Sequence, residues 1–115
     1  MLIAVAGPYS ADTAEQRQRN LDAMNEAAGV MRRGHIPVIG VNAALPIVER
    51  LGAEVDRYEA MMAISLALVD KCEAILVISE SAGVDRERDL VRSKGLPVYR
   101  RVDEIAAATS ANGAT

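Results

Sequence analysis

The sequence predicts an α/β protein built as a three-layer sandwich, with a small parallel sheet between two layers of helices. Short apolar runs without polar alternation recur along the 115 residues, as expected of strands that are buried on both faces. Segments with helical spacing lie between these runs, and the links are short. Each crossover is therefore expected to return the chain to one sheet with its strands parallel.

The first strand and the first helix are expected within residues 1–34. The apolar run Leu2–Ala6 stops at Gly7-Pro8, which marks the end of a strand. Asp12 or Thr13 can cap the helix that follows, and Gly34 ends it. Apolar residues recur along one stripe of this helix at Leu21, Met24, Ala28 and Met31.

A long helical stretch is expected between the second and third strands. Residues 36–41 and 74–78 are the next two apolar runs. Helical spacing begins after Pro46, with an interruption expected at Gly52. The apolar positions that keep this spacing are Val55, Met62, Leu66 and Val69.

The last part of the sequence contains one more strand and two helical segments. A loop from Ser79 to Gly83 leads into a charged helix that ends at Gly95, and residues 97–99 form a short fourth strand. A final helix is expected over 102–108, and the sheet could carry a further edge strand. We therefore interpret residues 1–108 as a single α/β domain and residues 109–115 as a flexible C-terminal tail.

Composition excludes several classes of function. The net charge of −3 and the pI of about 5.1 give a nucleic acid polymer no overall attraction. The longest charge-poor stretches, Gly34–Val48 and Ala60–Val69, are too short to span a membrane, and no export signal is recognised. Cys72 is the single cysteine, so no internal disulfide can form, and a cytoplasmic location is expected.

The predicted strand order is second, first, third, fourth, as in Rossmann-like and flavodoxin-like sheets. Ligands of such folds bind where the direction of winding switches, at the carboxyl ends of the first and third strands. The loop Gly7-Pro8-Tyr9-Ser10 and the loop around Ser81 and Gly83 therefore face each other. Both loops lead into helix N-termini, whose N–H groups favour a phosphate. The alternative is that these residues only cap helices and turn the chain.

Neither loop has the glycine-rich pattern of a dinucleotide site or a P-loop, so no such cofactor is expected. Glu87 is the most informative residue of the second loop region, because it lies on a stripe with Val84 and Val91 that faces the sheet. A carboxylate in that place can act as a nucleophile on the anomeric carbon of a sugar. The alternatives are a favourable place near the helix N-terminus or a pair with a neighbouring arginine.

Two further residues are candidates for the same pocket. The hydroxyl of Tyr9 could orient Glu87 or contact a sugar, or its ring could cover the sheet edge. Glu59 interrupts the apolar stripe of the long helix and, with Asp56 and Tyr58 near the same helix start, could read polar edges of a ligand. The apolar residues of that helix exceed one stripe, which favours a contact between identical subunits or plain core packing: Met61, Met62, Leu66 and Leu68.

Several motifs in this order resemble a known family. They are Ala6-Gly7-Pro8-Tyr9-Ser10, Arg32-Arg33-Gly34-His35, and Ser81-x-Gly83-Val84-x-x-Glu87 followed by Gly95-x-Pro97-Val98. Over residues 1–104 the chain resembles the nucleoside 2-deoxyribosyltransferase-like family, including its branch of nucleoside 5′-monophosphate N-glycosidases.

The resemblance implies an enzyme that cleaves or transfers the bond between base and sugar of a nucleotide or nucleoside, with no metal and no cofactor. It also implies a homodimer or homotetramer. By resemblance, Glu87 is the nucleophile, Tyr9 is the first-loop tyrosine, and Ser81 contacts the 5′-phosphate beside Gly83 and Val84. This favours a nucleotide over a free nucleoside.

The sequence departs from the family at one position. Where family enzymes often carry an aspartate before the third strand, the nearest equivalent here is Ser65. Loss of that carboxylate leaves open a non-catalytic protein that binds or senses a nucleotide in the same crevice.

Overall fold

The computed structural model describes residues 1–25 and 27–108, and these form the predicted α/β sandwich. One sheet of four strands has the order β2-β1-β3-β4, as predicted, and the pairs are all parallel. The expected tail, residues 109–115, lies outside the described residues. The strands are β1 (Leu2–Ala6), β2 (Ile36–Val38), β3 (Ala74–Val77) and β4 (Val98–Tyr99).

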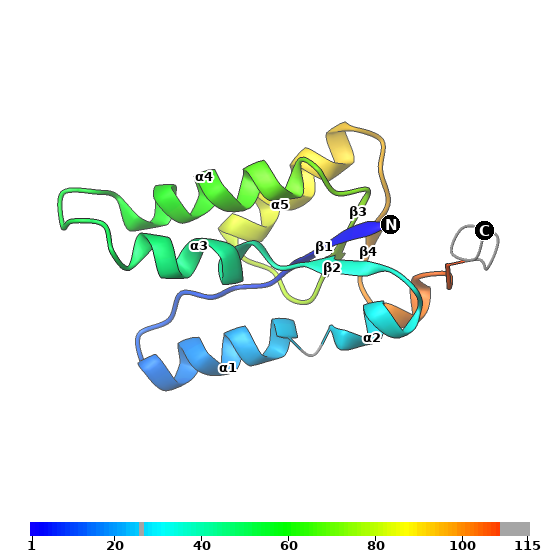
Figure 1. The fold of residues 1–115 in the computed structure, drawn as a ribbon, viewed down its shortest axis with the longest axis horizontal. Coiled ribbons are helices and arrows are strands. Elements are labelled where there is room, and N and C mark those ends of the chain that lie inside the picture. The colour runs from blue at the N-terminus through cyan, green and yellow to red at the C-terminus, as the bar shows by residue number, and fades with distance from the viewer. Residues whose placement is uncertain (26, 109–115) are drawn as a thin grey trace.

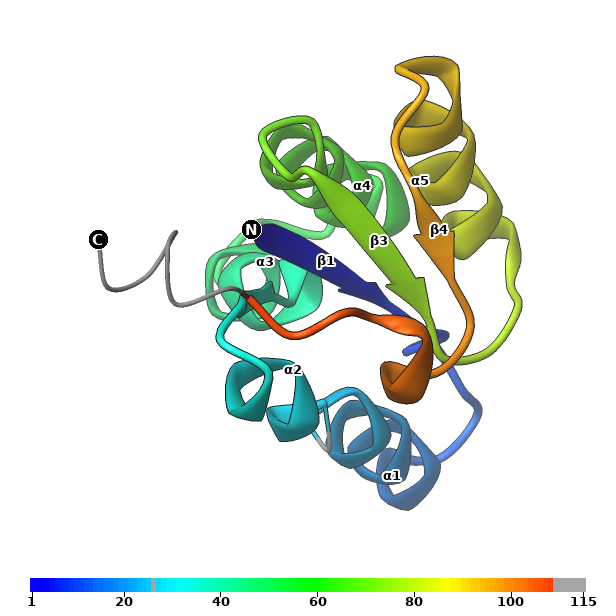
Figure 2. The same cartoon turned by 90° about the vertical axis from the view of Figure 1, so that its right-hand side faces the viewer.

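Successive residues of the two central strands face opposite layers. Ile3 and Val5 of β1 pack into one core with α1 (Ala14–Asn25) and α2 (Ala28–Arg32). Ala4 and Ala6 pack into the other, beneath α4 (Arg57–Val69) and α5 (Ala82–Ser93). Figure 2 shows α1 and α2 on one side of the sheet and α4 and α5 on the other. Burial on both faces explains why these runs lack polar alternation.

The first helical region is two helices, where the sequence predicted one. Gly34 ends the region as predicted, with a φ of +85° that suits glycine. Met24 of α1 is buried, whereas the side chain of Met31 on α2 is 58% exposed. The predicted apolar stripe is therefore wrong beyond α1, because a second helix beginning at Ala28 does not continue the rotation of the first.

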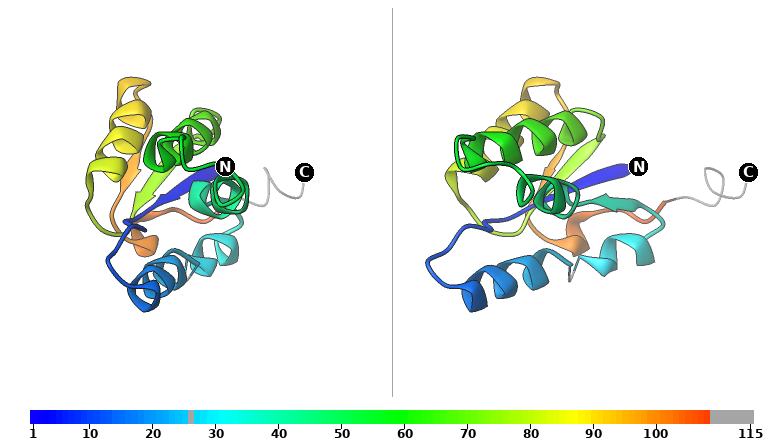
Figure 3. Two further views of the ribbon diagram at one scale, coloured as in Figure 1. Left: turned by 90° about the vertical axis from the view of Figure 1, so that its left-hand side faces the viewer. Right: turned by 60° about the vertical axis from the view of Figure 1, so that its left-hand side comes forward.

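The second strand is shorter than predicted. β2 ends at Val38, and α3 (Gly40–Val48) begins within the apolar run and contains Pro46. An apolar run of this length is compatible with a strand or a buried helix turn, which explains the error. The interruption between α3 and α4 falls around Gly52, as predicted. Figures 1 and 3 show α3 and α4 lying side by side.

The last segment also differs from its prediction. Instead of a helix over 102–108, one 3-10 turn, η1 (Val102–Glu104), is followed by an extended strap. The strap is held by Arg33, whose carbonyl accepts from the Ala108 N–H and whose Nη1 donates to the Ile105 carbonyl. Ile105 is fully buried in the core of α1 and α2. Within the described residues, no helix has the length and apolar character needed to cross a membrane.

Candidate active site

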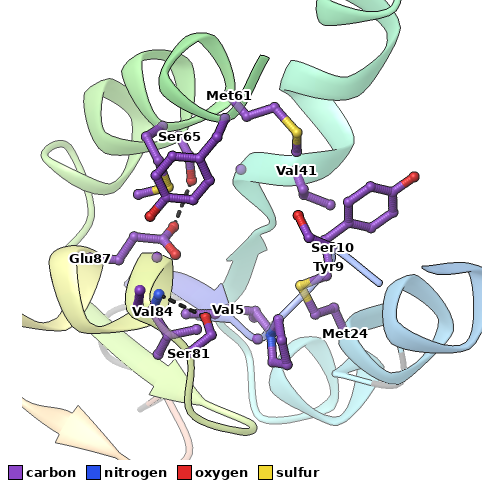
Figure 4. Close-up of a pocket in the computed structure, with 18 residues that line it drawn as sticks. Val5, Tyr9, Ser10, Met24, Val41, Met61, Ser65, Ser81, Val84 and Glu87 are labelled. Atoms are coloured by element: carbon purple, nitrogen blue, oxygen red, sulfur yellow. Dashed lines mark hydrogen bonds between the residues drawn. The ribbon is translucent and has the colours of Figure 1, made fainter. Parts of the chain in front are cut away.

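A cavity of about 280 Å³ opens at the carboxyl ends of β1 and β3. This is the place where the strand order predicts a ligand. Its walls come from the end of β1 and the loop after it, the start of α3, the inner side of α4 and the start of α5 (Figure 4). The lining residues are Val5, Ala6, Gly7, Pro8, Tyr9, Ser10, Met24, Gly40, Val41, Tyr58, Met61, Met62, Ser65, Ser81, Ala82, Gly83, Val84 and Glu87.

Most of the residues predicted from sequence meet in this cavity. The two loops lie on opposite walls, as their positions after β1 and β3 predict. The predicted site residues among the lining are Gly7, Pro8, Tyr9, Ser10, Ser81, Gly83, Val84 and Glu87. Met61 and Met62 also line the cavity, so the apolar excess on the long helix is explained here in part by the cavity wall.

The Glu87 side chain is buried and held by one hydrogen bond. Val84, Glu87 and Val91 form the buried face of α5, as the sequence pattern predicts, and Glu87 is 8% exposed. Ser65 of α4 donates from Oγ to Glu87 Oε2 at 2.6 Å (Figure 4). The other oxygen, Oε1, has no hydrogen-bond partner among the described residues yet is not sealed from solvent. Since Glu87 lines the cavity, Oε1 is the oxygen available to a ligand.

The electrostatics of the cavity disfavour an ionised Glu87. Burial raises the pKa of the Glu87 carboxyl above its ordinary value, and the hydrogen bond from Ser65 opposes this with a smaller effect. Glu87 is the only charged side chain among the described residues that line the cavity, so none of them supplies a cation that stabilises its ionised form. The carboxylate is consequently basic and poorly solvated, which are the properties of a reactive nucleophile.

Helical periodicity did not mark Ser65 as a site residue, and only the family resemblance singled out its position. It lies with Met62 and Val69 on the buried face of α4 and is 7% exposed. A small hydroxyl on an apolar stripe is a weak signal, because serine is also tolerated in helix packing. In the structure α3 approaches Ser65 closely, since a Cβ added to Gly40 would lie 2.1 Å from Ser65 Oγ.

We expect Ser65→Ala to raise the pKa of Glu87 further, because the mutation removes the one hydrogen bond that stabilises the ionised carboxyl. The variant should also lose about 1.5 to 3 kcal/mol of stability at a pH where Glu87 is ionised, the usual contribution of a hydrogen bond to a charged group. NMR titration of the Glu87 carboxyl carbon measures the first effect. Ser93→Ala is the control, since Ser93 is exposed on the same helix as Glu87. An unchanged Glu87 titration in Ser65→Ala would contradict this account.

The raised pKa of Glu87 also predicts how stability depends on pH. In the folded protein this group binds a proton more readily than in the unfolded chain. The stability that Glu87 contributes to the fold is therefore fully present below the unfolded-state pKa of this group. It is lost as pH rises through the raised folded-state pKa. We expect Glu87→Gln to abolish this loss and to be more stable than the wild type above that pH. Urea unfolding of both proteins across pH measures the difference, and parallel curves would refute it.

Tyr9 lines the cavity but does not orient Glu87. In Figure 4 its ring points away from Glu87, and it packs against the core that contains Met24. No hydrogen bond joins Tyr9 to Glu87 among the described residues, so the structure does not show Tyr9 orienting Glu87, whereas contact of Tyr9 with a sugar stays a prediction. Tyr58 of α4 also lines the cavity, and its hydroxyl lies 3.5 Å from the place where a Cβ on Gly83 would lie. Its ring is stacked by the Arg86 guanidinium at 5.8 Å.

Glu59 is not part of the cavity lining, contrary to the sequence prediction. Its carboxylate is exposed and pairs with Arg86 of α5 at 3.0 Å. Asp56 accepts from the Glu59 N–H and so caps α4. Glu59 and Tyr58 occupy neighbouring positions one turn before Met62, and it is Tyr58 that lines the cavity. Glu59 instead bridges α4 to α5 at the surface.

The serines of the two loops have different roles. Ser81 caps α5, because its Oγ accepts from the Val84 N–H at 3.2 Å. The capping alternative raised by the sequence is therefore confirmed for Ser81, and this cap uses the hydroxyl oxygen as an acceptor and not its O–H as a donor. Ser10 is exposed at the cavity edge, and α1 is capped by Thr13, whose Oγ1 accepts from the Gln16 N–H. Thr13 rather than Asp12 is thus the cap of the first helix.

The site offers an unpaired carboxylate oxygen in a mostly apolar cavity, with hydroxyls of serine and tyrosine around it. The described residues hold no group of three or more histidine, cysteine, aspartate or glutamate side chains placed to share a metal ion. A scan against protein-family models and a search of curated proteins find no match to this chain.

Proposed function

We propose that this protein cleaves or transfers the N-glycosidic bond of a nucleoside 5′-monophosphate or nucleoside, with Glu87 as the nucleophile. The observation that carries the proposal is the position and the hydrogen bonding of the Glu87 carboxyl. One oxygen is fixed by Ser65, the other is open to the cavity, and the group lies at the switch point of the sheet. The resemblance of the loop motifs to nucleoside 2-deoxyribosyltransferase-like proteins points to the same chemistry.

The reaction has two displacement steps. Glu87 Oε1 forms a bond to C1′ of the sugar while the bond from C1′ to the base nitrogen breaks, and the base leaves with the bonding electron pair and takes up a proton from solvent. Water or a second base then attacks C1′ on the face that the first base has left, loses a proton to solvent and releases the Glu87 carboxylate. A carboxylate in an apolar setting stabilises the positive charge that develops on the sugar more strongly than it would in water.

The setting of the site suits a small ligand. The cavity of about 280 Å³ is bordered by the aromatic ring of Tyr58, which offers a surface for the base, and by the hydroxyls of Ser10 and Ser81. A nucleotide or nucleoside is the proposed partner.

The buried free thiol of Cys72 suits the proposed cytoplasmic location. Assembly of the chain into a homodimer or homotetramer stays a prediction.

A panel of nucleosides and nucleoside 5′-monophosphates tests the proposal. Each compound is incubated with the protein, and free base is measured by chromatography. Release of base from at least one compound at a rate proportional to protein concentration is the expected result. If no compound releases base with or without a second base as acceptor, the enzymatic proposal is wrong.

A second candidate function is a non-catalytic protein that binds or senses nucleotides. It is favoured by the cavity's charge, because Glu87 is the only charged residue among the described ones that line the cavity, and none of these supplies a second carboxyl to protonate the leaving base. Thermal unfolding separates the two functions. A ligand at 100 times its Kd adds about 2.7 kcal/mol of stability whether or not it is cleaved. Stabilisation by a nucleotide without base release would identify a binding protein.

A further inference from the structure

A second cavity of about 430 Å³ adjoins the first. It shares four lining residues with it, Tyr9, Ser10, Tyr58 and Met61. Beyond these it is bordered by Ala11 and Arg17 at the start of α1, by Leu45 and Glu49 at the end of α3, and by Arg57 at the start of α4. One ligand can therefore contact residues of both cavities.

The two cavities differ in charge. Among the described lining residues, the first holds Glu87 and no cation, whereas the second has two guanidinium groups and one carboxylate. Within the part of the chain that the structure describes, Arg17 and Arg57 are in no ion pair, and Glu49 lies within 4.0 Å of no cationic group. Among the described residues, the lining of the second cavity thus carries a net positive charge, whereas the lining of the first cavity carries a negative charge.

Both arginines keep donors for a ligand. Arg17 donates from Nη1 to the Ala11 carbonyl at 2.8 Å, and Arg57 donates from Nη1 to the Val48 carbonyl at 3.5 Å. A guanidinium has five N–H donors, so these single bonds position each group and leave most of its donors unused. Arginine pairs at such a site match the oxygens of a phosphate in geometry and charge.

We propose that the second cavity is the phosphate subsite of this protein, with Arg17 and Arg57 binding the phosphate of a ligand whose sugar lies against Glu87. The inference rests on the proposed function for the identity of the ligand. A phosphate in the first cavity would lie near Glu87, and none of the described residues that line this cavity supplies a cation to it. Ser10, which the sequence assigns to phosphate binding, lines both cavities.

Calorimetric titration tests the subsite in a Glu87→Gln background, in which the ligand is not consumed. The probes are a nucleoside 5′-monophosphate, the corresponding nucleoside and inorganic phosphate. Arg17→Gln and Arg57→Gln are each expected to weaken monophosphate binding about ten-fold or more, as for a lost hydrogen bond to a charged group, and to leave nucleoside binding within about two-fold. Arg32→Gln, which removes a cation from α2 outside both cavities, should change neither.

Three results would overturn the subsite. The arginine variants could weaken the binding of nucleoside and of monophosphate equally, or they could weaken the binding of neither. The third result is that no phosphate-containing probe binds the parent protein. If a glutamine variant does not fold, Arg17→Lys and Arg57→Lys keep the charge, and rising salt should weaken the binding of monophosphate but not of nucleoside. Failure of the proposed function is a separate result, because base release by the wild type is not measured in these titrations.

Discussion

Glu87→Gln is expected to lower base release by about a thousand-fold or more, because an amide cannot replace a carboxylate as the nucleophile. The exchange preserves the shape of the side chain and keeps an oxygen that can accept from Ser65. Binding of the nucleotide should therefore persist while turnover is lost. Chromatographic assay of free base and titration of the ligand measure the two effects on the same protein.

Asp89→Asn is the matched control, since Asp89 is an exposed carboxylate two positions along the same helix. It should leave base release unchanged. The pH profile provides a further check, because the nucleophile must be ionised. Burial raises the pKa of Glu87, so activity should fall with decreasing pH at higher pH values than for an ordinary glutamate. Equal rates for Glu87→Gln and wild type would show that Glu87 is not the nucleophile.

Gly40→Ala is expected to destabilise the protein by about 3 kcal/mol, which is at the upper end of the usual cost of overpacking a core. The added Cβ would lie 2.1 Å from Ser65 Oγ and 3.0 Å from Ser65 Cα. Because the backbone of α4 is among the obstructing atoms, a side-chain rotation cannot relieve the clash. The helices α3 and α4 must separate, and the hydrogen bond from Ser65 to Glu87 is disturbed with them. Urea unfolding measures the cost.

Gly83→Ala is the control for this substitution. Its added Cβ would meet Met62 Sδ at 3.2 Å, in a flexible side chain that can move, and alanine is a better helix former than glycine. We expect its stability to lie within about 1 kcal/mol of the wild type. A Gly40→Ala variant as stable as Gly83→Ala would mean that the two helices do not pack as closely as described.

The fold was predictable because simple sequence patterns determine which segments form strands and how these strands pair. Strands buried on both faces and short links determine a parallel sheet, and the order with β1 between β2 and β3 confirms this reasoning. The boundaries of helices and strands were less predictable where the same residues are compatible with both a strand and a helix. The apolar run 36–41 divides between β2 and α3, and α3 begins at Gly40, where only glycine permits close packing on Ser65.

The site was predictable to the extent that topology places its residues. Position on the α5 stripe predicted the burial of Glu87, and the strand order brought the two loops together. The same stripe argument failed for Glu59, because Tyr58 in the neighbouring position lines the cavity. The direction of the Tyr9 ring depends on a side-chain torsion that sequence spacing does not determine. Ser65 gave only a weak signal, since its importance depends on contact with another helix.

The short outer strands of the sheet affect how copies of this chain can associate. At one margin β2 has three residues, the middle one being Pro37, which has no N–H to donate, and at the other margin β4 has two residues. Such margins offer too few free backbone groups to template an added strand, which protects against amyloid-like stacking. Self-association of the folded chain is therefore expected through helical surfaces rather than by growth of the sheet into a neighbour.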